Sequence, residues 1–416
     1  MAFGGHKEVV QMLLDKGADV NVQGGHFGNA LQVASYGGHK EVVQMLLDKG
    51  ADVNAQGGEY GNALQGASYG GHEEIVQMLL DKGADVNAQG GPYGNALQAA
   101  SFGGHKEVVQ ILLDKGAEVH AQGGEYGNAL QGASYGGHKE IVQMLLDKGA
   151  DVNAQGGEYG NALQAASFGG HKEVIQILLD KGADIGNALQ AASYGGHKEI
   201  VQMLLDKGAD INAQGGNIGN ALQAASFGGH KEVVQILLDK GAHVNAQGGH
   251  FGNALQGASY GGHKEIVQML LDKGAEVHAQ GGEYGNALQA ASDEGHKEIV
   301  QMLVNKGADV NTQGGHFGSA LQAASLRGHK EIVQMLLNKG ADITVANEGG
   351  WTPFYSASGS GHLEVVKLLL DKGADITVAD NDGWTPLHAA SGSSHLEVVK
   401  LLLDKGADIT VADKDG

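Results

Sequence analysis

A 33-residue repeat constrains this chain more than any other feature of its sequence. A tetrapeptide of the type Asn-Ala-Leu-Gln recurs in steps of 33 residues, with one step of 26, and twelve complete units follow a partial unit that begins at Met1. A fixed period of this length indicates stacked structural repeats, so counting domains from the chain length does not apply. The units open at Asn29, Asn62, Asn95, Asn128, Asn161, Asn187, Asn220, Asn253, Asn286, Ser319, Thr352 and Thr385.

One unit, residues 62–94, predicts a helix, a turn, a second helix and a loop. Asn62 and Gln65 have the spacing of an N-cap and its capping-box partner, and the first helix they start is expected to end at the Gly70-Gly71 pair. The second helix is expected to run from His72 to Gly83, with Ile75, Val76, Leu79 and Leu80 on one face. The glycine-rich remainder predicts a turn-containing loop. Two short helices cannot bury both faces alone, so each unit requires its neighbours.

Composition and charge exclude several kinds of partner and site. The 71 glycines against 3 prolines indicate many tight turns between short elements. The formal charge of −21 would repel a phosphate backbone, so we expect no nucleic-acid partner. The absence of cysteine excludes disulfides and thiolate metal sites. Without a signal-like leader or a run of 18 apolar residues, we expect an intracellular, cytoplasmic protein that does not bind a membrane.

No residue pattern predicts catalysis, a cofactor or a metal. Thirteen of the 20 histidines occupy one repeat position, from His6 to His395, which indicates a structural role at the start of the second helix through a bond to the local backbone. The other seven lack the i, i+4 spacing of a helical zinc site. Loops such as 57–61 have glycines but no phosphate-binding lysine. We therefore expect a non-enzyme with no cofactor and no metal.

The last units resemble a known family almost residue for residue. Residues 385–391 read Thr-Pro-Leu-His-Ala-Ala-Ser, and with 395–399 and 402–408 they resemble an ankyrin repeat, of which the earlier Asn-Ala-Leu-Gln units are variants. The resemblance implies a mostly α ankyrin-repeat solenoid of stacked helix-turn-helix units, with β-hairpin loops as fingers and a groove lined by the fingers and first helices. The near-identical units also resemble the C-terminal ankyrin arrays of fungal nucleotide-binding immune-type receptors, although no P-loop is present.

The predicted organisation is a single ankyrin-repeat domain over residues 1–416. It comprises a partial repeat over 1–28, ten repeats over 29–349 with one shortened near 185–186, and two repeats closer to the common pattern over 350–416. The shortened unit lacks seven residues between Gly182 and Asn187, which predicts one missing finger with stacking maintained. Both ends lack a capping repeat, which is expected of a fragment, a truncated product or a protomer that stacks end to end.

Aromatic residues fall into two columns, which hold 17 of the 21 Phe, Tyr and Trp residues. The first column, at the end of the first helix, contains Phe3, Tyr36, Tyr69, Phe102, Tyr135, Phe168, Tyr194, Phe227 and Tyr260. The second, at the loop tip, contains Phe27, Tyr60, Tyr93, Tyr126, Tyr159, Phe251, Tyr284 and Phe317. Because the resemblance places both columns on the usual contact surface, we expect these rings to bind a partner. The alternative is that rings of adjacent units stack and only seal the groove edge.

The predicted function is a non-catalytic scaffold that binds a protein partner through the groove and the loop tips. Alanine at Tyr135 and Phe168 should then weaken binding with little loss of stability. Loop-tip residues Glu59, Glu125, Glu158 and Glu283 add a preference for basic partners. In the last four units the first-column position is occupied by a residue other than an aromatic: Asp293, Leu326, Gly359 and Gly392. These units are therefore expected to act differently. The alternative function is a structural or self-assembling solenoid that associates through its uncapped ends. The protein would then self-associate end to end, whereas the binding scaffold would be a monomer.

Overall fold

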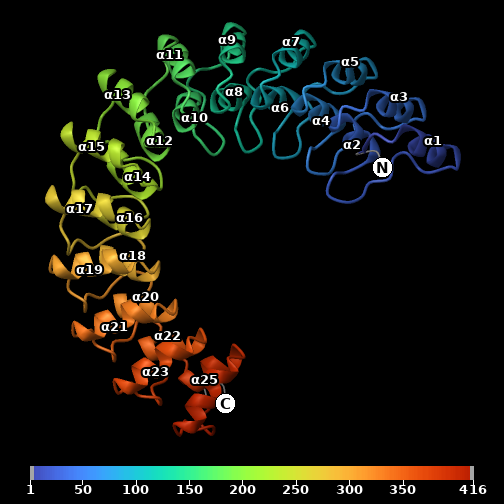
Figure 1. Cartoon of the computed structure of the whole chain (residues 1–416). Coiled ribbons are helices and arrows are strands. Elements are labelled where there is room, and N and C mark those ends of the chain that lie inside the picture. The colour runs from blue at the N-terminus through green and yellow to red at the C-terminus, as the bar shows by residue number, and fades with distance from the viewer. Residues whose placement is uncertain (1–3, 413–416) are drawn as a thin grey trace. The chain divides into compact units, whose positions relative to one another are not determined.

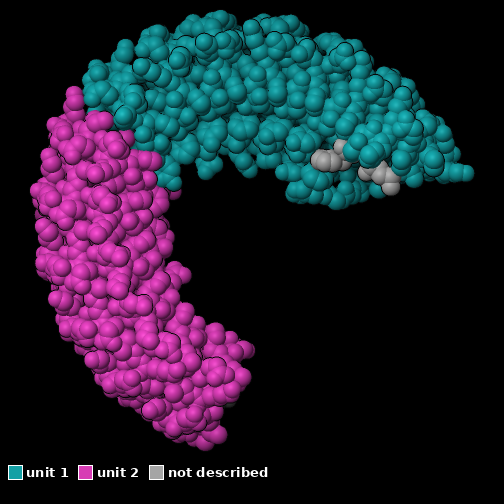
Figure 2. Space-filling model, viewed as in Figure 1, with its two compact units in different colours: residues 1–209 teal, residues 210–416 magenta. Residues whose placement is uncertain are grey.

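The computed structural model describes residues 4–412 and divides the chain into two compact units. Unit 1 is Met1–Ala209 and unit 2 is Asp210–Gly416 (Figure 2). The described residues form 25 α-helices and no β-strand, and consecutive helices pack as pairs (Figure 1). The predicted fold, a mostly α stack of helix-turn-helix repeats, is confirmed. None of these helices is long and apolar enough to cross a membrane. Phe3 of the first column lies outside the described residues.

Unit 1 contains helices α1 to α13. Its first helices are α2 (Ala30–Tyr36), α4 (Ala63–Tyr69), α6 (Ala96–Gly103), α8 (Ala129–Tyr135), α10 (Ala162–Gly169) and α12 (Ala188–Tyr194). Its second helices are α1 (Lys7–Asp15), α3 (Lys40–Asp48), α5 (Glu73–Asp81), α7 (Lys106–Asp114), α9 (Lys139–Asp147), α11 (Lys172–Asp180) and α13 (Lys198–Asp206).

Unit 2 contains helices α14 to α25. Its first helices are α14 (Ala221–Gly228), α16 (Ala254–Tyr260), α18 (Ala287–Asp293), α20 (Ala320–Leu326), α22 (Pro353–Gly359) and α24 (Pro386–Gly392). Its second helices are α15 (Lys231–Asp239), α17 (Lys264–Asp272), α19 (Lys297–Asn305), α21 (Lys330–Asn338), α23 (Leu363–Asp371) and α25 (Leu396–Asp404).

Side-chain caps fix where the first helices begin. Asn95 has an extended backbone, and its side chain accepts a hydrogen bond from the backbone N–H of Gln98, while Gln98 accepts from the N–H of Asn95. This capping box satisfies backbone groups that a helix start leaves unpaired. At Asn62 the N-cap is confirmed but the reciprocal bond is absent, and the Gln65 amide donates to carbonyls of the following loop.

Small residues let the first helices lie closely side by side. Within each unit consecutive first helices contact one another more extensively than consecutive second helices do. Ala63, Ala67 and Ser68 of α4 are buried, and a Cβ at Gly66 would stand 3.4 Å from the Cβ of Tyr36 in the preceding repeat. The second helices add the large apolar side chains: Leu79 and Val76 of α5 are fully buried. Each buried leucine of this kind contributes roughly 2 kcal/mol of transfer free energy.

The fingers close by single antiparallel bridges instead of strands. One bridge joins Gly123 to Gly127, and five other fingers have the same pairing. The expected hairpins are therefore very short, because each loop has few residues and its carbonyls face the neighbouring repeat. Glycine is required at Gly94, which has φ 84°, and a Cβ there would meet the Gln98 side chain and stand 3.0 Å from the Gly123 oxygen.

Stacking continues through the shortened connection of unit 1, as predicted. Residues 183–187 form a turn in place of a finger, and α12 still packs on α10. The outer turn keeps its bonds, since Asn153 Nδ2 donates to Gly182 O and Asp184 N donates to Asn153 Oδ1. The shortening changes the helix start, because Asn187 has a non-extended backbone and makes no side-chain cap. The missing finger thus removes loop contacts without interrupting the helical stack.

The recurring histidine joins repeats, which corrects the expectation of a local bond. Nε2 of His72 donates to the carbonyl of Tyr36 at 2.8 Å, and His105 bonds Tyr69 in the same way. The partner lies 36 residues earlier, on the first helix of the preceding repeat. The role is structural, as predicted, but the bond fastens one repeat to the next.

Candidate protein-binding surface

The two aromatic columns of unit 1 merge into one continuous row of rings. Each fingertip ring lies over the first-column ring of the same repeat, with centroid distances of 4.1 Å for Tyr36–Tyr60, 4.4 Å for Tyr69–Tyr93 and 4.6 Å for Tyr135–Tyr159. First-column rings of successive repeats also stack on one another, and the last such pair in unit 1 is Phe168–Tyr194 at 5.6 Å. We call this set the unit 1 ring row: Phe27, Tyr36, Tyr60, Tyr69, Tyr93, Phe102, Tyr126, Tyr135, Tyr159, Phe168 and Tyr194.

Unit 2 has a shorter row built in the same way. Phe251 lies 4.2 Å from Phe227, and Tyr284 lies 4.5 Å from Tyr260. Fingertip rings follow one another at 6.1 Å for Phe251–Tyr284 and 6.4 Å for Tyr284–Phe317. The unit 2 ring row consists of Phe227, Phe251, Tyr260, Tyr284 and Phe317. The structure therefore brings the sequence-predicted site residues of each unit together, and it also shows them packing on one another.

Burial differs along the rows. Tyr60 and Phe251 are buried at 9% and 7% exposure, whereas Phe27 is 37% exposed. The other rings of both rows are half-buried. Burial raises the pKa of Tyr93 above its usual range, and a hydrogen bond with Tyr69 raises it further. The Tyr93 hydroxyl, like that of an unperturbed tyrosine, is neutral at physiological pH and can act as a hydrogen-bond donor.

On several first helices a glutamine holds the following finger in place. Nε2 of Gln98 donates to Ala121 O at 3.3 Å, Gly123 O at 3.1 Å and Gly127 O at 2.7 Å. Gln32, Gln131 and Gln223 make the same three bonds, the shortest of them from Gln131 to Gly160. Gln164 precedes the missing finger, and in the described residues its side chain bonds only to Asn161. These finger clamps fix the loops that carry the fingertip rings.

Successive fingertips are also hydrogen-bonded to one another. The N–H of Glu158 donates to Glu125 O at 2.8 Å, and in unit 2 the N–H of His316 donates to Glu283 O at 2.9 Å. Pro92 has no N–H, so the bond from this fingertip to the preceding one is missing, although its carbonyl accepts from Glu125 at 2.7 Å. The fingertips therefore form an ordered backbone ladder beside the ring rows.

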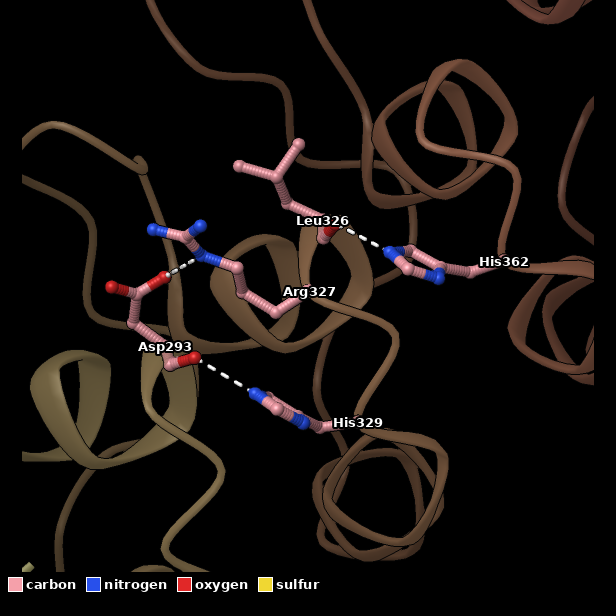
Figure 3. A network of polar contacts seen from close by, with 5 residues as sticks. All are labelled: Asp293, Leu326, Arg327, His329 and His362. Carbon is pink, nitrogen blue, oxygen red and sulfur yellow. Dashed lines mark hydrogen bonds and ion pairs between the residues drawn. The ribbon is translucent and has the colours of Figure 1, made fainter. Parts of the chain in front are cut away.

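The first-column rings of unit 2 end at an ion pair whose carboxylate is buried and whose arginine is exposed. Asp293 occupies the first-column position, its side chain is 1% exposed, and Oδ1 accepts a hydrogen bond from Nε of Arg327 at 2.8 Å (Figure 3). The Arg327 guanidinium also lies 5.9 Å from the centre of the Phe317 ring, within reach of a cation–π interaction. His329 donates to the carbonyl of Asp293, so the inter-repeat histidine bond is unchanged (Figure 3). Replacing the first-column ring by Asp293 thus changes the side-chain contacts and leaves the backbone contact between the repeats unchanged.

A family model described as ankyrin repeats (3 copies) matches the chain in overlapping windows. The matched residues are 1–90, 88–156, 132–215, 162–248, 190–281, 223–314, 254–347, 289–380 and 320–413. The chain belongs to the ankyrin repeat family. Ankyrin repeats are generally protein–protein interaction modules, and ankyrin-repeat proteins are typically non-catalytic. None of the curated proteins compared with the chain matches it.

The fingertip carboxylates of these ankyrin repeats are of two kinds. Glu59 pairs with His26 at 3.0 Å, and Glu283 pairs with His250 at 2.7 Å. Glu125 and Glu158 have no ion-pair partner among the described residues, and both are exposed on adjacent fingers. Their charges, added to burial, raise the pKa of the neighbouring Tyr126. The two unpaired carboxylates therefore form an acidic fingertip pair in unit 1. In residues 4–412 no group of three His, Asp or Glu side chains could hold a metal ion.

Sequence reasoning missed three features of this surface. It assigned the repeated glutamine to capping alone, although an amide recurring at that position in every Asn-Ala-Leu-Gln unit indicates a further role. It did not pair Asp293 with Arg327. The two positions are 34 residues apart, and the equivalent positions of most earlier units have an aromatic residue and a glycine, so the appearance of two opposite charges was a signal. It also passed over Trp351, which stands where earlier fingers have glycine.

Proposed function

We propose that this ankyrin-repeat protein is a non-catalytic scaffold that binds a protein partner along its ring rows and fingertips. One observation carries the proposal: the rings of each unit form a continuous, half-buried aromatic surface whose fingers are held by glutamine clamps and fingertip bonds. A preorganised aromatic surface loses little conformational entropy on binding, so it suits an interaction site. Sixteen rings contribute to it: Tyr36, Tyr69, Phe102, Tyr135, Phe168, Tyr194, Phe227, Tyr260, Phe27, Tyr60, Tyr93, Tyr126, Tyr159, Phe251, Tyr284 and Phe317.

Two finer statements belong to the same proposal. The absence of cysteine and the acidic charge fit a protein of the cytoplasm, acting without a cofactor or a nucleic-acid partner. The near-identical repeats support a role as the recognition array of a fungal nucleotide-binding immune-type receptor, in which successive repeats would contact an extended partner. Weak contacts repeated along one rigid array add through effective concentration, which favours such a ligand.

Replacing both Tyr135 and Phe168 by alanine is expected to weaken partner binding at least about tenfold, since two aromatic contacts are lost. Stability should also fall, because Tyr135 lies within 6.1 Å of four other ring centres. The sequence-based prediction was a small loss of stability for these two substitutions, and the observed ring packing makes a larger loss the expected result. The measurement is isothermal titration calorimetry with a partner first identified by affinity capture and mass spectrometry.

A matched control separates binding from stability. Leu146 of α9 is half-buried on the second helix of the same repeat as Tyr135, away from the rings. Leu146→Ala should lower the melting temperature while leaving the partner affinity unchanged. Unchanged affinity in the folded Tyr135→Ala/Phe168→Ala variant would refute binding by the ring row.

Neutralising the acidic fingertip pair is expected to slow association with a basic partner. The double substitution Glu125→Gln/Glu158→Gln removes two exposed charges that steer the encounter, so the association rate should drop on the order of threefold at low salt. Raising the ionic strength should reduce the wild-type rate more steeply than that of the variant. Stopped-flow kinetics would measure both. Glu59→Gln/Glu283→Gln, whose carboxylates pair with histidines, should change the rate less, and an equal change would contradict the assignment.

A second candidate function is self-association through the terminal repeats. Met12 of α1 and Leu396 of α25 are exposed at 65% and 61%, so apolar side chains are available on both terminal repeats. Sedimentation velocity over a range of concentrations tests it: a constant monomer mass excludes this function and leaves partner binding by the rings.

A further inference from the structure

Unit 2 contains a cavity at the point where its row of rings stops. It measures about 580 Å³ and lies between the finger at residues 313–318 and the finger at residues 346–351. Phe317, Leu326, Trp351 and Ser356 are among its lining residues. Its size falls in the range of about 300–1,000 Å³ that is usual for ligand pockets.

The repeat register identifies what is absent from this cavity. In both units a fingertip ring lies over the first-column residue of its own repeat and beside the preceding fingertip ring, as Tyr284 does with Tyr260 at 4.5 Å and Phe251 at 6.1 Å. One repeat beyond Phe317, the first-column residue is Leu326 and the fingertip position is Gly350. The cavity is lined by Leu326 and Phe317, the two residues that the next ring would contact. It therefore occupies the place of a missing ring.

The chain cannot supply that ring from its own finger. Gly350 has φ 82°, and a Cβ there would stand 2.7 Å from Asn381 N. The finger is closed differently from the earlier ones, because Asn347 Oδ1 accepts hydrogen bonds from the N–H groups of Gly349 and Trp351, both at 3.0 Å. The N–H of Gly349 is thus unavailable to the preceding fingertip. Among the described residues the carbonyl of His316 accepts no backbone hydrogen bond, whereas the fingertip carbonyl of Glu283 does.

The far wall of the cavity is held in position. Trp351 stacks on Tyr355 with ring centres 5.8 Å apart, and its Nε1 donates to Asp380 Oδ2 at 3.2 Å. The Tyr355 hydroxyl donates to the same oxygen at 2.9 Å. Burial, together with this bond to Asp380, raises the pKa of Tyr355 above its usual range, so the hydroxyl remains a donor. A wall fixed in this way does not have to be ordered when a ligand binds.

We propose that this cavity accepts a phenylalanine or tyrosine side chain from an extended segment of a partner protein. The ring would lie on Leu326 beside Phe317, and a backbone N–H of the segment would donate to His316 O, as the next fingertip does elsewhere in the array. The occupant's chemistry follows from the three preceding fingers at 248–252, 281–285 and 314–318, each of which places a ring and a hydrogen-bonded N–H at the equivalent position. Exposed Glu348 on the rim favours a neutral or basic segment. The inference rests on the proposed function and names the side chain that this part of the surface recognises.

A fingertip peptide tests the proposal without the natural partner. The probe is acetyl-Gln-Gly-Gly-His-Phe-Gly-Ser-amide, which copies residues 313–319, and the matched control has alanine in place of phenylalanine. In the Trp384→Phe background Trp351 is the single tryptophan, so its fluorescence reports the cavity wall directly. Trp384 is a suitable residue to replace, because it is 41% exposed and does not line the cavity. We expect a saturable fluorescence change with the phenylalanine peptide, and binding weaker by about tenfold or more with the alanine peptide.

Substitution of the cavity floor supplies the second measurement. Leu326→Ala should weaken the phenylalanine peptide about fivefold or more through lost contact area. Leu337→Ala, on half-buried α21 surface outside the cavity, should leave the affinity unchanged, with circular dichroism confirming that both variants are folded. Equal affinity for the two peptides, no saturable response, or insensitivity to Leu326→Ala would each overturn the proposal.

The two proposals fail in different ways. If the peptide does not bind while ring-row variants still lose the natural partner, the cavity assignment is wrong and the scaffold function stands. If the peptide binds as expected while no ring-row variant affects the partner, the cavity is a separate aromatic site and the proposed function is wrong.

Discussion

Replacing Gln98 by alanine is expected to lower the free energy of unfolding of unit 1 by about 3 kcal/mol. The side chain makes four hydrogen bonds, each worth about 1 kcal/mol, and the total is smaller than their sum because the two amide hydrogens are shared among three carbonyls. Gln98 is buried, its Nε2 donates to three carbonyls of the following finger, and its Oε1 accepts from Asn95 N at 2.6 Å. The truncation would leave those carbonyls without their partner and release the finger that carries Tyr126. Urea denaturation followed by circular dichroism measures the loss.

Gln164 provides the matched control. It occupies the same position of α10, but the finger that its amide would hold is missing, and it keeps the capping bonds with Asn161. Gln164→Ala should therefore cost only about 1 kcal/mol. Equal losses in the two variants would show that the finger bonds contribute nothing and that capping accounts for the whole effect.

Arg327→Ala is expected to destabilise unit 2 by about 2 kcal/mol. Removing one partner of an ion pair in which both groups are buried leaves an uncompensated charge and costs about 3–5 kcal/mol. Here the charge left without its partner is the buried Asp293 carboxylate, and we expect a smaller cost because water reaches the Arg327 side of the pair. The Asp293 side chain is 1% exposed and that of Arg327 is 52% exposed. The cation–π contact with Phe317 would also be lost. Thermal and urea unfolding of the full chain measure the change.

A double-mutant cycle tests the physical reason. Asp293→Tyr/Arg327→Gly restores an aromatic ring and a glycine, as at the equivalent pair Phe227 and Gly261, so its stability should equal or exceed that of the wild type. In the Asp293→Tyr background, changing Arg327 to alanine should cost little, because no buried carboxylate remains. A loss of about 2 kcal/mol there as well would mean that Arg327 stabilises the repeat by packing alone.

The local parts of the repeat were predictable because they depend on neighbours within a few residues. The N-cap at Asn95, its capping box with Gln98 and the helix ends at glycine pairs are short-range features, and the sequence places them correctly. The same holds for the apolar face of the second helix and for the shortened unit near Gly186. The reciprocal capping bond at Asn62 was predicted and is absent, whereas the Gln65 amide donates to a loop 23 and 29 residues ahead.

Features that join repeats could not be assigned from the sequence, since they depend on which atoms of neighbouring units meet. The histidine column was expected to bond local backbone, but His72 reaches Tyr36 in the preceding repeat. The two aromatic columns look separate in the sequence, yet Tyr60 lies between Tyr36 and Tyr69 in space. The residues in these contacts are separated by about one repeat period, so the contacts cannot be assigned until the angle and spacing between stacked repeats are known.

By itself the sequence determined the repeat period, the helix pair in each unit, the missing finger and the candidate set of rings. These follow from periodicity, capping and turn chemistry, which act within one unit. Only the tertiary structure decided that the rings form continuous rows, that Asp293 needs Arg327, and that the unit 2 row ends at a cavity shaped for one more ring. The physical reason is that stacking sets distances between side chains of different repeats, and those distances determine packing, charge pairing and open volume.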